Sequence, residues 1–237
     1  MVSKVLAATS GLVAAGDRGV MATAIDGPEP GMIVLLDSSG RLVAGGSEPP
    51  AAVVAVAQTV LDNGTPEVIE ADGVSWFVEP VLPPPKLIVL GAIAAADALV
   101  PMATAAGFAV HVIDTREWLA DDARFPEGTA VHCGAPLDML RNVGIDSATS
   151  IVSFLHEGRL EDPVLLEALR SPARYVGSMG SGKSTAAKRE RLADAGIEPR
   201  LLARLHAPIG LRIGSRTPQE MAVAVLAEVV AVGRGHG

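Results

Sequence analysis

The most suggestive residues in the sequence form a glycine-rich turn, GSMGSGKS, from Gly177 to Ser184. The spacing matches G-x-x-x-x-G-K-[ST], the phosphate-binding loop of many ATP- and GTP-binding proteins. Glycines expose backbone amides, and the start of a following helix favours an anion. Hydrolysis would also need an acidic residue at the end of an apolar strand to hold magnesium, and no such strand follows Lys183. We therefore expect Gly177, Gly180, Ser181 and Lys183 to bind a phosphate that is carried rather than cleaved, with phosphotransfer as the weaker alternative.

A second candidate site follows a strongly apolar run, where the sequence reads VLGAIAAADAL. A dinucleotide-binding turn has the form G-x-G-x-x-G, and its second glycine lets a pyrophosphate approach the backbone. Gly91 fits the first position, but the β-branched Ile93 stands at the second. Asp114, about 20 residues further on, ends the next apolar run, where a carboxylate could accept a ribose hydroxyl. We expect a nucleotide or pterin-type ligand at Gly91 and Asp114; the alternative is a purely structural turn and cap.

Four more side chains have the chemistry of ligand contacts. His156 follows an apolar run within SFLHEG and can exchange a proton or hydrogen-bond a ligand, unless it is simply a surface histidine. His206 and Arg216 lie in LHAPIGLRIGSRTP, whose glycines and prolines indicate a shaped loop, and Arg216 precedes a helix start that suits an anion. Arg116 follows Asp114 closely, and we count it among the polar contacts of the ligand.

The sequence offers no comparable case for a metal centre or a covalent nucleophile. The five histidines have no spacing typical of a zinc site, and one cysteine cannot form an internal disulfide. Cys133 ends an apolar run, and we expect a buried, inert thiol there. No G-x-S-x-G turn or nucleophile–histidine–acid arrangement is evident. We therefore predict no catalytic residues and no metal ligands.

Strand and helix signals alternate over residues 87–237, and these elements must position the candidate residues. KLIVLG, FAVHVID, TAVHCG, TSIVSFLHE and RYVGS read as buried strands. Helices are expected at 92–107, 162–171, 184–196 and 220–232, with Asp162 as the cap of the second and a Thr217–Glu220 capping box at the last. The alternation predicts a Rossmann-like, doubly wound parallel sheet, with ligands at the carboxyl ends of its strands.

Residues 1–80 predict a smaller α+β domain. Three segments read as strands, and the turn Asp37–Gly40 predicts a hairpin within the second of them. Residues 49–64 predict a helix that begins at a Pro-Pro pair and ends at Asn-Gly. Three consecutive prolines then forbid a helix and favour a stiff, extended chain. We place a linker at 81–86 and the Rossmann-like domain at 87–237.

Composition narrows the class of function. Hydrophobic residues make up 49% of the chain, and the formal net charge is -8. An acidic protein repels nucleic-acid backbones, so we expect no nucleic-acid partner. No apolar run is long enough for a membrane span, and the N-terminal segment fits an amphipathic helix better than a signal peptide. We expect a cytoplasmic protein.

Two longer segments are more specific than any single motif. Residues 175–183 read YVGSMGSGK, and residues 206–222 read HAPIGLRIGSRTPQEMA. They resemble the Y-[IV]-G-x-x-G-S-[RK] turn and the H-x-P-I-G-L-x-I-G-[AS]-x-[ST]-P-x-E-[IM]-A segment of the XdhC/CoxI family, the accessory proteins of xanthine and carbon-monoxide dehydrogenase maturation. Gly182 is inserted in the first segment, and the second is intact. The resemblance is strong over the second domain and weak over the first.

The resemblance implies a protein that binds molybdenum cofactor and delivers it, in sulfurated form, to a molybdenum hydroxylase of the xanthine, aldehyde or CO dehydrogenase type. It implies a maturation chaperone more than an enzyme, with the apo-hydroxylase and a sulfurtransferase as partners, and it leaves a homodimer open. The glycine turn would then match the phosphate-binding loop by coincidence. The alternative for the same crevice is an NAD(P)- or nucleotide-binding oxidoreductase or sensor.

Two departures from the family pattern bear on ligand contact. Ser47 stands where the family has the cysteine of S-G-G-C-[VI]-E, and serine is a far poorer ligand of sulfur or molybdenum. Ile93 interrupts the usual G-x-G-H-V of the first crossover. The resemblance therefore implies a divergent member, which has either taken another ligand or serves as a scaffold.

Overall fold

The computed structural model describes residues 2–236, and the chain divides into two units between Pro84 and Pro85. Each unit is described by itself below. Among the described residues, no helix has both the length and the apolar character that crossing a bilayer requires.

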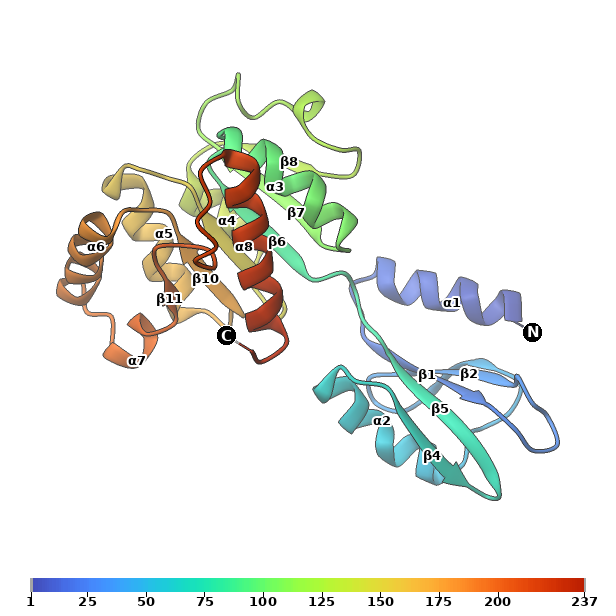
Figure 1. Ribbon diagram of the computed structural model, residues 1–237. Coiled ribbons are helices and arrows are strands. Elements are labelled where there is room, and N and C mark those ends of the chain that lie inside the picture. The colour runs from blue at the N-terminus through green and yellow to red at the C-terminus, as the bar shows by residue number, and fades with distance from the viewer. Residues whose placement is uncertain (1, 237) are drawn as a thin grey trace. The chain divides into compact units, whose positions relative to one another are not determined.

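The first unit is a five-stranded antiparallel sheet in the order β3-β2-β1-β5-β4, with one helix on each face (Figure 1). Side chains alternate between the faces, because successive residues of a strand point to opposite sides. In β2, Val34 and Leu36 pack beneath α2, whereas Leu35 packs with Val5 of α1. The elements are α1 (Val2–Ala14), β1 (Gly19–Ala24), β2 (Ile33–Asp37), β3 (Leu42–Gly45), α2 (Ala51–Asn63), β4 (Glu67–Ala71) and β5 (Val74–Val81).

The hairpin between β2 and β3 forms where the sequence predicts it. The Asp37 carboxylate accepts hydrogen bonds from the amides of Ser39 and Arg41 at 2.9 and 3.0 Å. Gly40 has a φ of 81°, a conformation that costs glycine little. The turn residues therefore fix the register of this edge of the sheet.

The second unit contains a six-stranded parallel sheet in the order β11-β10-β9-β6-β7-β8. Counted along the chain from β6, this is the order 3-2-1-4-5-6 of a dinucleotide-binding sheet. The predicted doubly wound parallel sheet is therefore confirmed. Its elements are β6 (Lys86–Leu90), α3 (Ala94–Ala105), β7 (Ala109–Asp114), η1 (Asp122–Arg124), β8 (Ala130–Cys133), α4 (Pro136–Val143), β9 (Ser150–Ser153), α5 (Gly158–Arg170), β10 (Tyr175–Ser178), α6 (Gly182–Asp194), α7 (Pro199–Leu202), β11 (Leu205–His206) and α8 (Pro218–Gly233).

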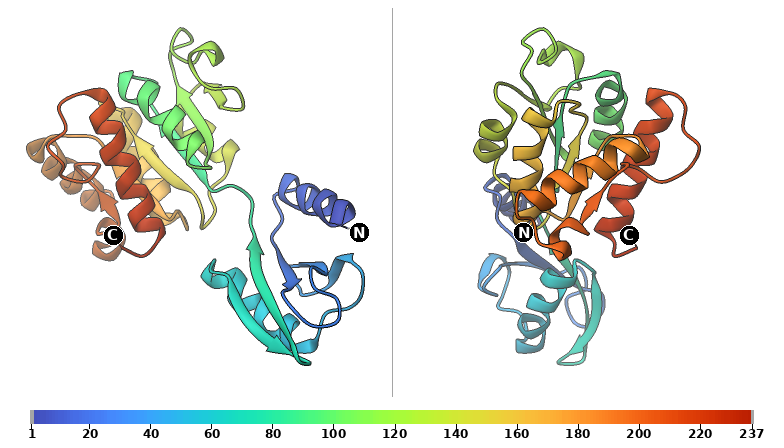
Figure 2. Two further views of the ribbon diagram at one scale, coloured as in Figure 1. Left: turned by 45° about the vertical axis from the view of Figure 1, so that its right-hand side comes forward. Right: turned by 90° about the vertical axis from the view of Figure 1, so that its left-hand side faces the viewer.

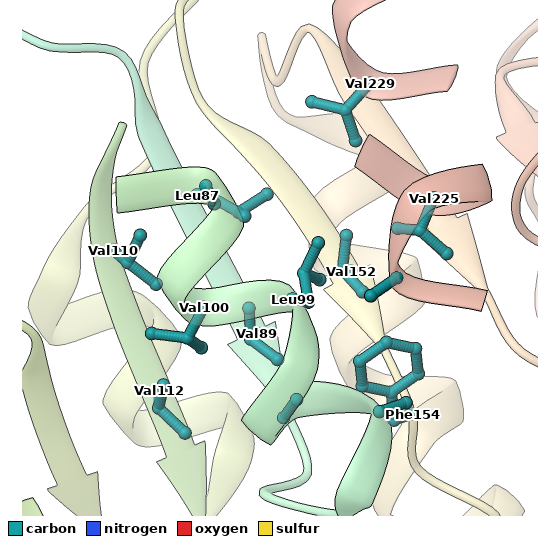
Figure 3. Close-up of a cluster of buried hydrophobic side chains, with 14 of the residues drawn as sticks. Leu87, Val89, Leu99, Val100, Val110, Val112, Val152, Phe154, Val225 and Val229 are labelled. Carbon is teal, nitrogen blue, oxygen red and sulfur yellow. The ribbon is translucent and has the colours of Figure 1, made fainter. Parts of the chain in front are cut away.

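Helices cover both faces of this sheet, as the right-hand view of Figure 2 shows. Leu87 and Val89 of β6 point to the face under α3 and α8, and Figure 3 shows them packed with Leu99 and Val225 of those helices. The intervening Ile88 points to the opposite core, which α4, α5, α6 and α7 cover. Because both faces are buried, the strands read as continuous apolar runs in the sequence.

Three features of the second unit differ from the prediction. The short elements α4, α7 and β11 were not predicted, and α5 begins at Gly158 rather than after Asp162. The extra turn of α5 places Glu161 within reach of the ends of β9 and β10, and Asp162 binds Arg191 instead of acting as a cap. Cys133 is exposed, because it ends the edge strand β8.

Candidate functional site

The sheet has its switch point between β6 and β9, since the chain continues from these neighbours toward opposite edges. The loops that leave the two strands diverge, and such a crevice is where ligands bind in this architecture. Gly91 turns the chain after β6 with a φ of 97°. A Cβ at Gly91 would lie 3.3 Å from the backbone of Phe154, which follows β9. Glycine is therefore required both for the turn and for the close approach of the two loops.

Asp114 lies at the end of β7 and is almost completely buried, with 2% of its surface exposed. One carboxylate oxygen accepts hydrogen bonds from the amide and Nε of Arg116, and the other accepts from Arg116 Nη2 and the Ala92 amide, all at 2.8 to 2.9 Å. Burial acts to raise the pKa of Asp114, but these bonds outweigh it and lower the pKa. Both carboxylate oxygens thus already accept hydrogen bonds from the protein itself, and a ribose hydroxyl would have to displace Arg116 to bind Asp114.

Arg116 is half-exposed at the mouth of the crevice, where Asp114 fixes its guanidinium. Its Cζ lies 5.7 Å from the centroid of the Trp118 ring, whose residue is 72% exposed. Arg124 fastens the loop that carries both residues, because it donates to the Ala92 carbonyl at 3.0 Å and to Asp97 at 2.6 Å. The crevice therefore presents a cation and an aromatic face. Trp118 was not predicted as a site residue from the sequence. An aromatic residue shortly after Asp114 could have indicated it, because aromatic residues make up only 3% of the chain.

The residues of the glycine turn at the end of β10 have two structural roles: some allow close packing in the core, and others cap the helix that follows. Gly177 lies inside β10, where a Cβ would come within 2.6 Å of Tyr175 and of Ile209. Ser181 is the N-cap of α6 and accepts from the Ser184 amide at 3.2 Å. Gly180 lies between them, and Lys183 is exposed, with an ammonium group that forms no hydrogen bond or ion pair within the described residues 2–236. The first glycine of the apparent phosphate-binding loop thus makes room for a tyrosine.

A buried ion pair, which the sequence did not reveal, joins the helices on either side of this turn. Glu161 of α5 and Lys188 of α6 meet at 2.7 Å, and their side chains are 2% and 6% exposed. The hydroxyls of Ser153 and Ser178 each donate to the other Glu161 oxygen at 2.7 Å. Lys188 also donates to Ser178 and to the Met179 carbonyl. Every charged atom of the pair is hydrogen-bonded, as buried charges require.

A cavity of about 430 Å³ opens above this ion pair. His156 belongs to its wall, so the structure brings His156 and Gly180 together, on the side of the β9 loop where α5 begins. The volume is in the range of small-molecule sites. The lining residues are Leu155, His156, Gly158, Glu161, Met179, Gly180, Ser184, Ala187, Lys188 and Arg191.

His206 and Arg216 have other surroundings. The His206 ring stacks on Tyr175 with centroids 4.7 Å apart, and its Nδ1 lies 3.4 Å from a carboxylate oxygen of Glu228. Burial and the adjacent Glu228 raise the pKa of Tyr175, whose hydroxyl donates to that carboxylate. Arg216 is exposed, and its amide donates to Glu220 at 2.6 Å within the capping box of α8, which is confirmed. His206 therefore ties β11 to α8, and the structure does not bring these two residues into the cavity lining.

Residues 87–229, which contain the crevice and the cavity, match the family model described as the XdhC Rossmann domain. The chain belongs to the XdhC family. The resemblance seen in residues 175–183 and 206–222 is therefore confirmed, and both segments lie inside the matched region.

Curated proteins that resemble this XdhC-family chain are longer. The chain is 30% identical to the uncharacterized protein YqeB of Escherichia coli K12 over 152 residues, 62% of this chain and 27% of YqeB. It is 27% identical to a Bacillus subtilis 168 protein named as a probable xanthine dehydrogenase subunit, over 156 residues, 66% of this chain and 45% of that protein. It is 25% identical to the molybdenum cofactor insertion chaperone PaoD of E. coli K12 over 147 residues, 62% and 40% of the two chains. The chain spans less than half the length of each relative.

A solved structure supports the fold of both units. The crystal structure of a protein described as a xanthine dehydrogenase from Bacillus halodurans aligns with 97% of this XdhC-family chain and 63% of that chain, with a TM-score of 0.77. The identity is 20%, so the likeness concerns the fold.

Proposed function

We propose that the protein binds molybdenum cofactor and delivers it to a molybdenum hydroxylase, as a maturation chaperone and not as an enzyme in its own right. The observation that carries the proposal is the XdhC Rossmann match over 87–229, because this region contains the switch-point crevice. The names of two relatives, a cofactor insertion chaperone and a probable xanthine dehydrogenase subunit, support the same function. The partner is then the apo-hydroxylase, with a sulfurtransferase as the source of sulfur.

The crevice has a donor set that suits this cargo. Molybdenum cofactor is an anionic pterin. The Trp118 side chain offers a surface on which the pterin ring can stack, and the Arg116 guanidinium can donate a charge-assisted hydrogen bond to an anionic group of the cofactor. Ser47, at the family's cysteine position, is exposed in the first unit and donates weakly to the Met32 sulfur at 3.4 Å. A serine there is a poor metal ligand, so we assign cofactor contact to Gly91, Arg116 and Trp118.

Co-elution with the cofactor tests the proposal. The purified chain, mixed with molybdenum cofactor, should retain it through gel filtration and should restore activity when added to an apo-hydroxylase. Arg116→Ala should weaken retention about tenfold, since a hydrogen bond to a charged group is lost. Arg200→Ala is the matched control, because Arg200 also pairs with a nearby carboxylate but lies far along the chain on α7. No retention at micromolar protein would contradict the proposal.

A nicotinamide or adenine nucleotide is the second candidate for this crevice, and the strand order favours it. The Asp114 carboxylate already accepts hydrogen bonds from Arg116 and Ala92, which argues against its accepting one from a ribose hydroxyl. Calorimetric titration with NAD(H), NADP(H) and ATP separates the two functions. Binding of any of them at micromolar affinity, with no cofactor retention, would favour a nucleotide-dependent oxidoreductase or sensor.

A further inference from the structure

Beyond its first turn, helix α8 is apolar on its outer side as well as on its buried side. Between Met221 and Gly233 its only polar side chain is Glu228, which accepts hydrogen bonds from the Tyr175 hydroxyl and the Gly210 amide. The other side of the helix packs against α3 and the sheet (Figure 1). A surface helix ordinarily has polar residues on its outer face, and a helix that is apolar all round is ordinarily buried all round. The outer face of α8 therefore suits a cover that the described residues do not supply.

One stripe of residues runs along this outer face. It consists of Glu220, Val223, Ala227, Val230 and Arg234, which follow one another at intervals of three and four residues and so lie on one side of the helix. Val223 and Val230 are 47% and 42% exposed, and Glu220 and Arg234 are exposed as well. The stripe is thus apolar in the middle, acidic at one end and basic at the other, with an alanine at its centre.

The two charged ends of the stripe are free to bind an opposite charge. The Glu220 carboxylate uses Oε2 to accept hydrogen bonds from the amides of Arg216 and Thr217, and its Oε1 accepts none from the described residues. The Arg234 guanidinium makes no hydrogen bond or ion pair within residues 2–236. In contrast, every arginine of the described chain before residue 211 binds a carboxylate or a backbone carbonyl.

The stripe is complementary to itself when two copies run antiparallel. Glu220 and Arg234 lie equally far from Ala227 along the helix, so a two-fold axis at Ala227 places Glu220 of one copy opposite Arg234 of the other. The same axis brings the valines of the two copies together between the charged ends. The small alanine side chain on the axis lets the two helices approach closely. A second copy of the chain therefore has the charges that the stripe requires of its partner.

The loop before α8 widens the apolar surface beside the stripe. The Leu211 amide donates to the Ala224 carbonyl at 3.1 Å, so the loop lies against α8. The side chains of Leu211 and Ile213 are 42% and 55% exposed. Because the stripe extends over only about 21 Å of helix, the interface is at the small end of specific interfaces, and we expect a micromolar dissociation constant.

We propose that α8 forms the interface of a symmetric dimer, in which it packs antiparallel on α8 of a second copy about an axis at Ala227. Two Glu220–Arg234 ion pairs close the ends of this interface, and the valines of both copies fill it. Charge complementarity selects a second copy as the occupant, because the stripe needs a partner that is basic where it is acidic and acidic where it is basic. The inference does not rest on the proposed function, since no residue that we assign to cofactor contact lies on α8.

Sedimentation velocity of the full chain at increasing concentration tests the dimer. From about 1 to about 100 µM, the average mass should rise from that of one chain toward that of two. Ala227→Glu places two like charges on the axis and should keep the protein monomeric over this range. Ala186→Glu is the matched control, because Ala186 is also a helical alanine but lies exposed on α6, and this variant should dimerise as the parent does. Arg234→Glu replaces two ion pairs by two repulsions and should weaken dimerisation about tenfold at low salt.

Disulfide formation tests the position of the axis, and it does not depend on the stability of Ala227→Glu. In a Cys133→Ser background, which removes the exposed native thiol, Ala227→Cys puts one thiol of each copy on the axis. Helices that pack about 8 to 10 Å apart place two such Cα atoms roughly 4 to 6 Å apart, within reach of a disulfide. Air oxidation should give a covalent dimer on a non-reducing gel, whereas Ala186→Cys in the same background should stay monomeric.

Several results would overturn the proposal. One is a parent protein that stays monomeric up to about 100 µM. Another is a dimer that persists in Ala227→Glu, because its interface then lies elsewhere, or one that Ala186→Glu disrupts equally. A dimer that Arg234→Glu leaves unchanged, or equal cross-linking in the two cysteine variants, contradicts the antiparallel arrangement about Ala227.

Discussion

Gly177 matches the first glycine of the phosphate-binding-loop pattern, but its role in the structure is to allow close packing. Its Cα faces the Tyr175 ring and Ile209, so the absence of a side chain serves packing inside β10. The turn that could expose amides to a ligand begins only after Ser178. A phosphate-binding loop would instead need its first glycine in the loop itself.

Gly177→Ala should lower the free energy of unfolding by about 1 to 3 kcal/mol, the usual cost of inserting a methyl group into a filled core. Gly182→Ala is the control, because a Cβ at this first residue of α6 meets no atom within 4 Å. Urea unfolding of the three proteins checks the prediction. Equal stability of Gly177→Ala and the parent would show that the strand can make room.

A pair of histidines makes stability depend on pH. His111 Nδ1 of β7 lies 3.2 Å from His132 Nε2 of β8, with the rings stacked. Burial, then the neighbouring His132 and Lys86, lower the pKa of His111 below its ordinary value of 6.5. The unfolded chain therefore binds this proton more readily than the folded one. Stability contributed by neutral His111 is complete above pH 6.5 and is lost as the pH falls below it.

His111→Gln should accordingly reduce the loss of stability between about pH 7 and about pH 5. The measurement compares urea midpoints at the two pH values for the parent and the variant. His236→Gln, at an exposed position, should keep the parental loss. An undiminished loss in His111→Gln would assign the pH dependence to other groups.

At the scale of elements, α5 and α6 are held to the ends of β9 and β10 by the Glu161–Lys188 pair and two serines. Lys188→Met leaves Glu161 buried without a counter-charge, and removal of one partner of a buried pair costs roughly 3 to 5 kcal/mol. In the double variant Lys188→Met, Glu161→Met no charge is left, so most of that loss should be recovered. Denaturant midpoints of the single and double variants check this. A double variant as unstable as the single one would show that the serines, and not the charges, hold the helices.

The elements that the sequence predicted well are those whose signal is local. Continuous apolar runs such as KLIVLG identify buried strands, and Thr217 with Glu220 marks a helix start through two nearby residues. In contrast, β11 has only two residues and exists because the edge of β10 pairs with it. The short α4 has few apolar positions, although Leu137 and Leu140 are spaced as on one helical face.

The candidate site was predictable only in part, because only some of its features leave a local signal in the sequence. The positions of Gly91 and Asp114 follow from strand ends, and the structure places both at the crevice. The cavity depends on pairing between Glu161 and Lys188, which lie on different helices, and no spacing in the sequence reveals such a contact. The bond from Arg116 that occupies Asp114 was likewise invisible, although the two residues are close in the sequence.

At the scale of the whole molecule, the two units have separate hydrophobic cores. A chain of residues 85–237 should therefore fold without the first unit, since its two core clusters use none of the first 84 residues. It should unfold cooperatively, with the same midpoint as one of the transitions of the full chain. A fragment that lacks a cooperative transition, from a full chain that has one, would show that the second unit depends on the first.

The two tryptophans of the chain fall one to each unit, Trp76 at 2% exposure in the first and Trp118 at 72% exposure in the second. The protein thus contains two natural fluorophores of opposite character, one shielded with blue-shifted emission and one in water and open to iodide quenching. Changes in the shielded component follow the first unit alone. A change confined to the quenchable component reports events beside Arg116, so occupation of the crevice can be followed by emission without any label.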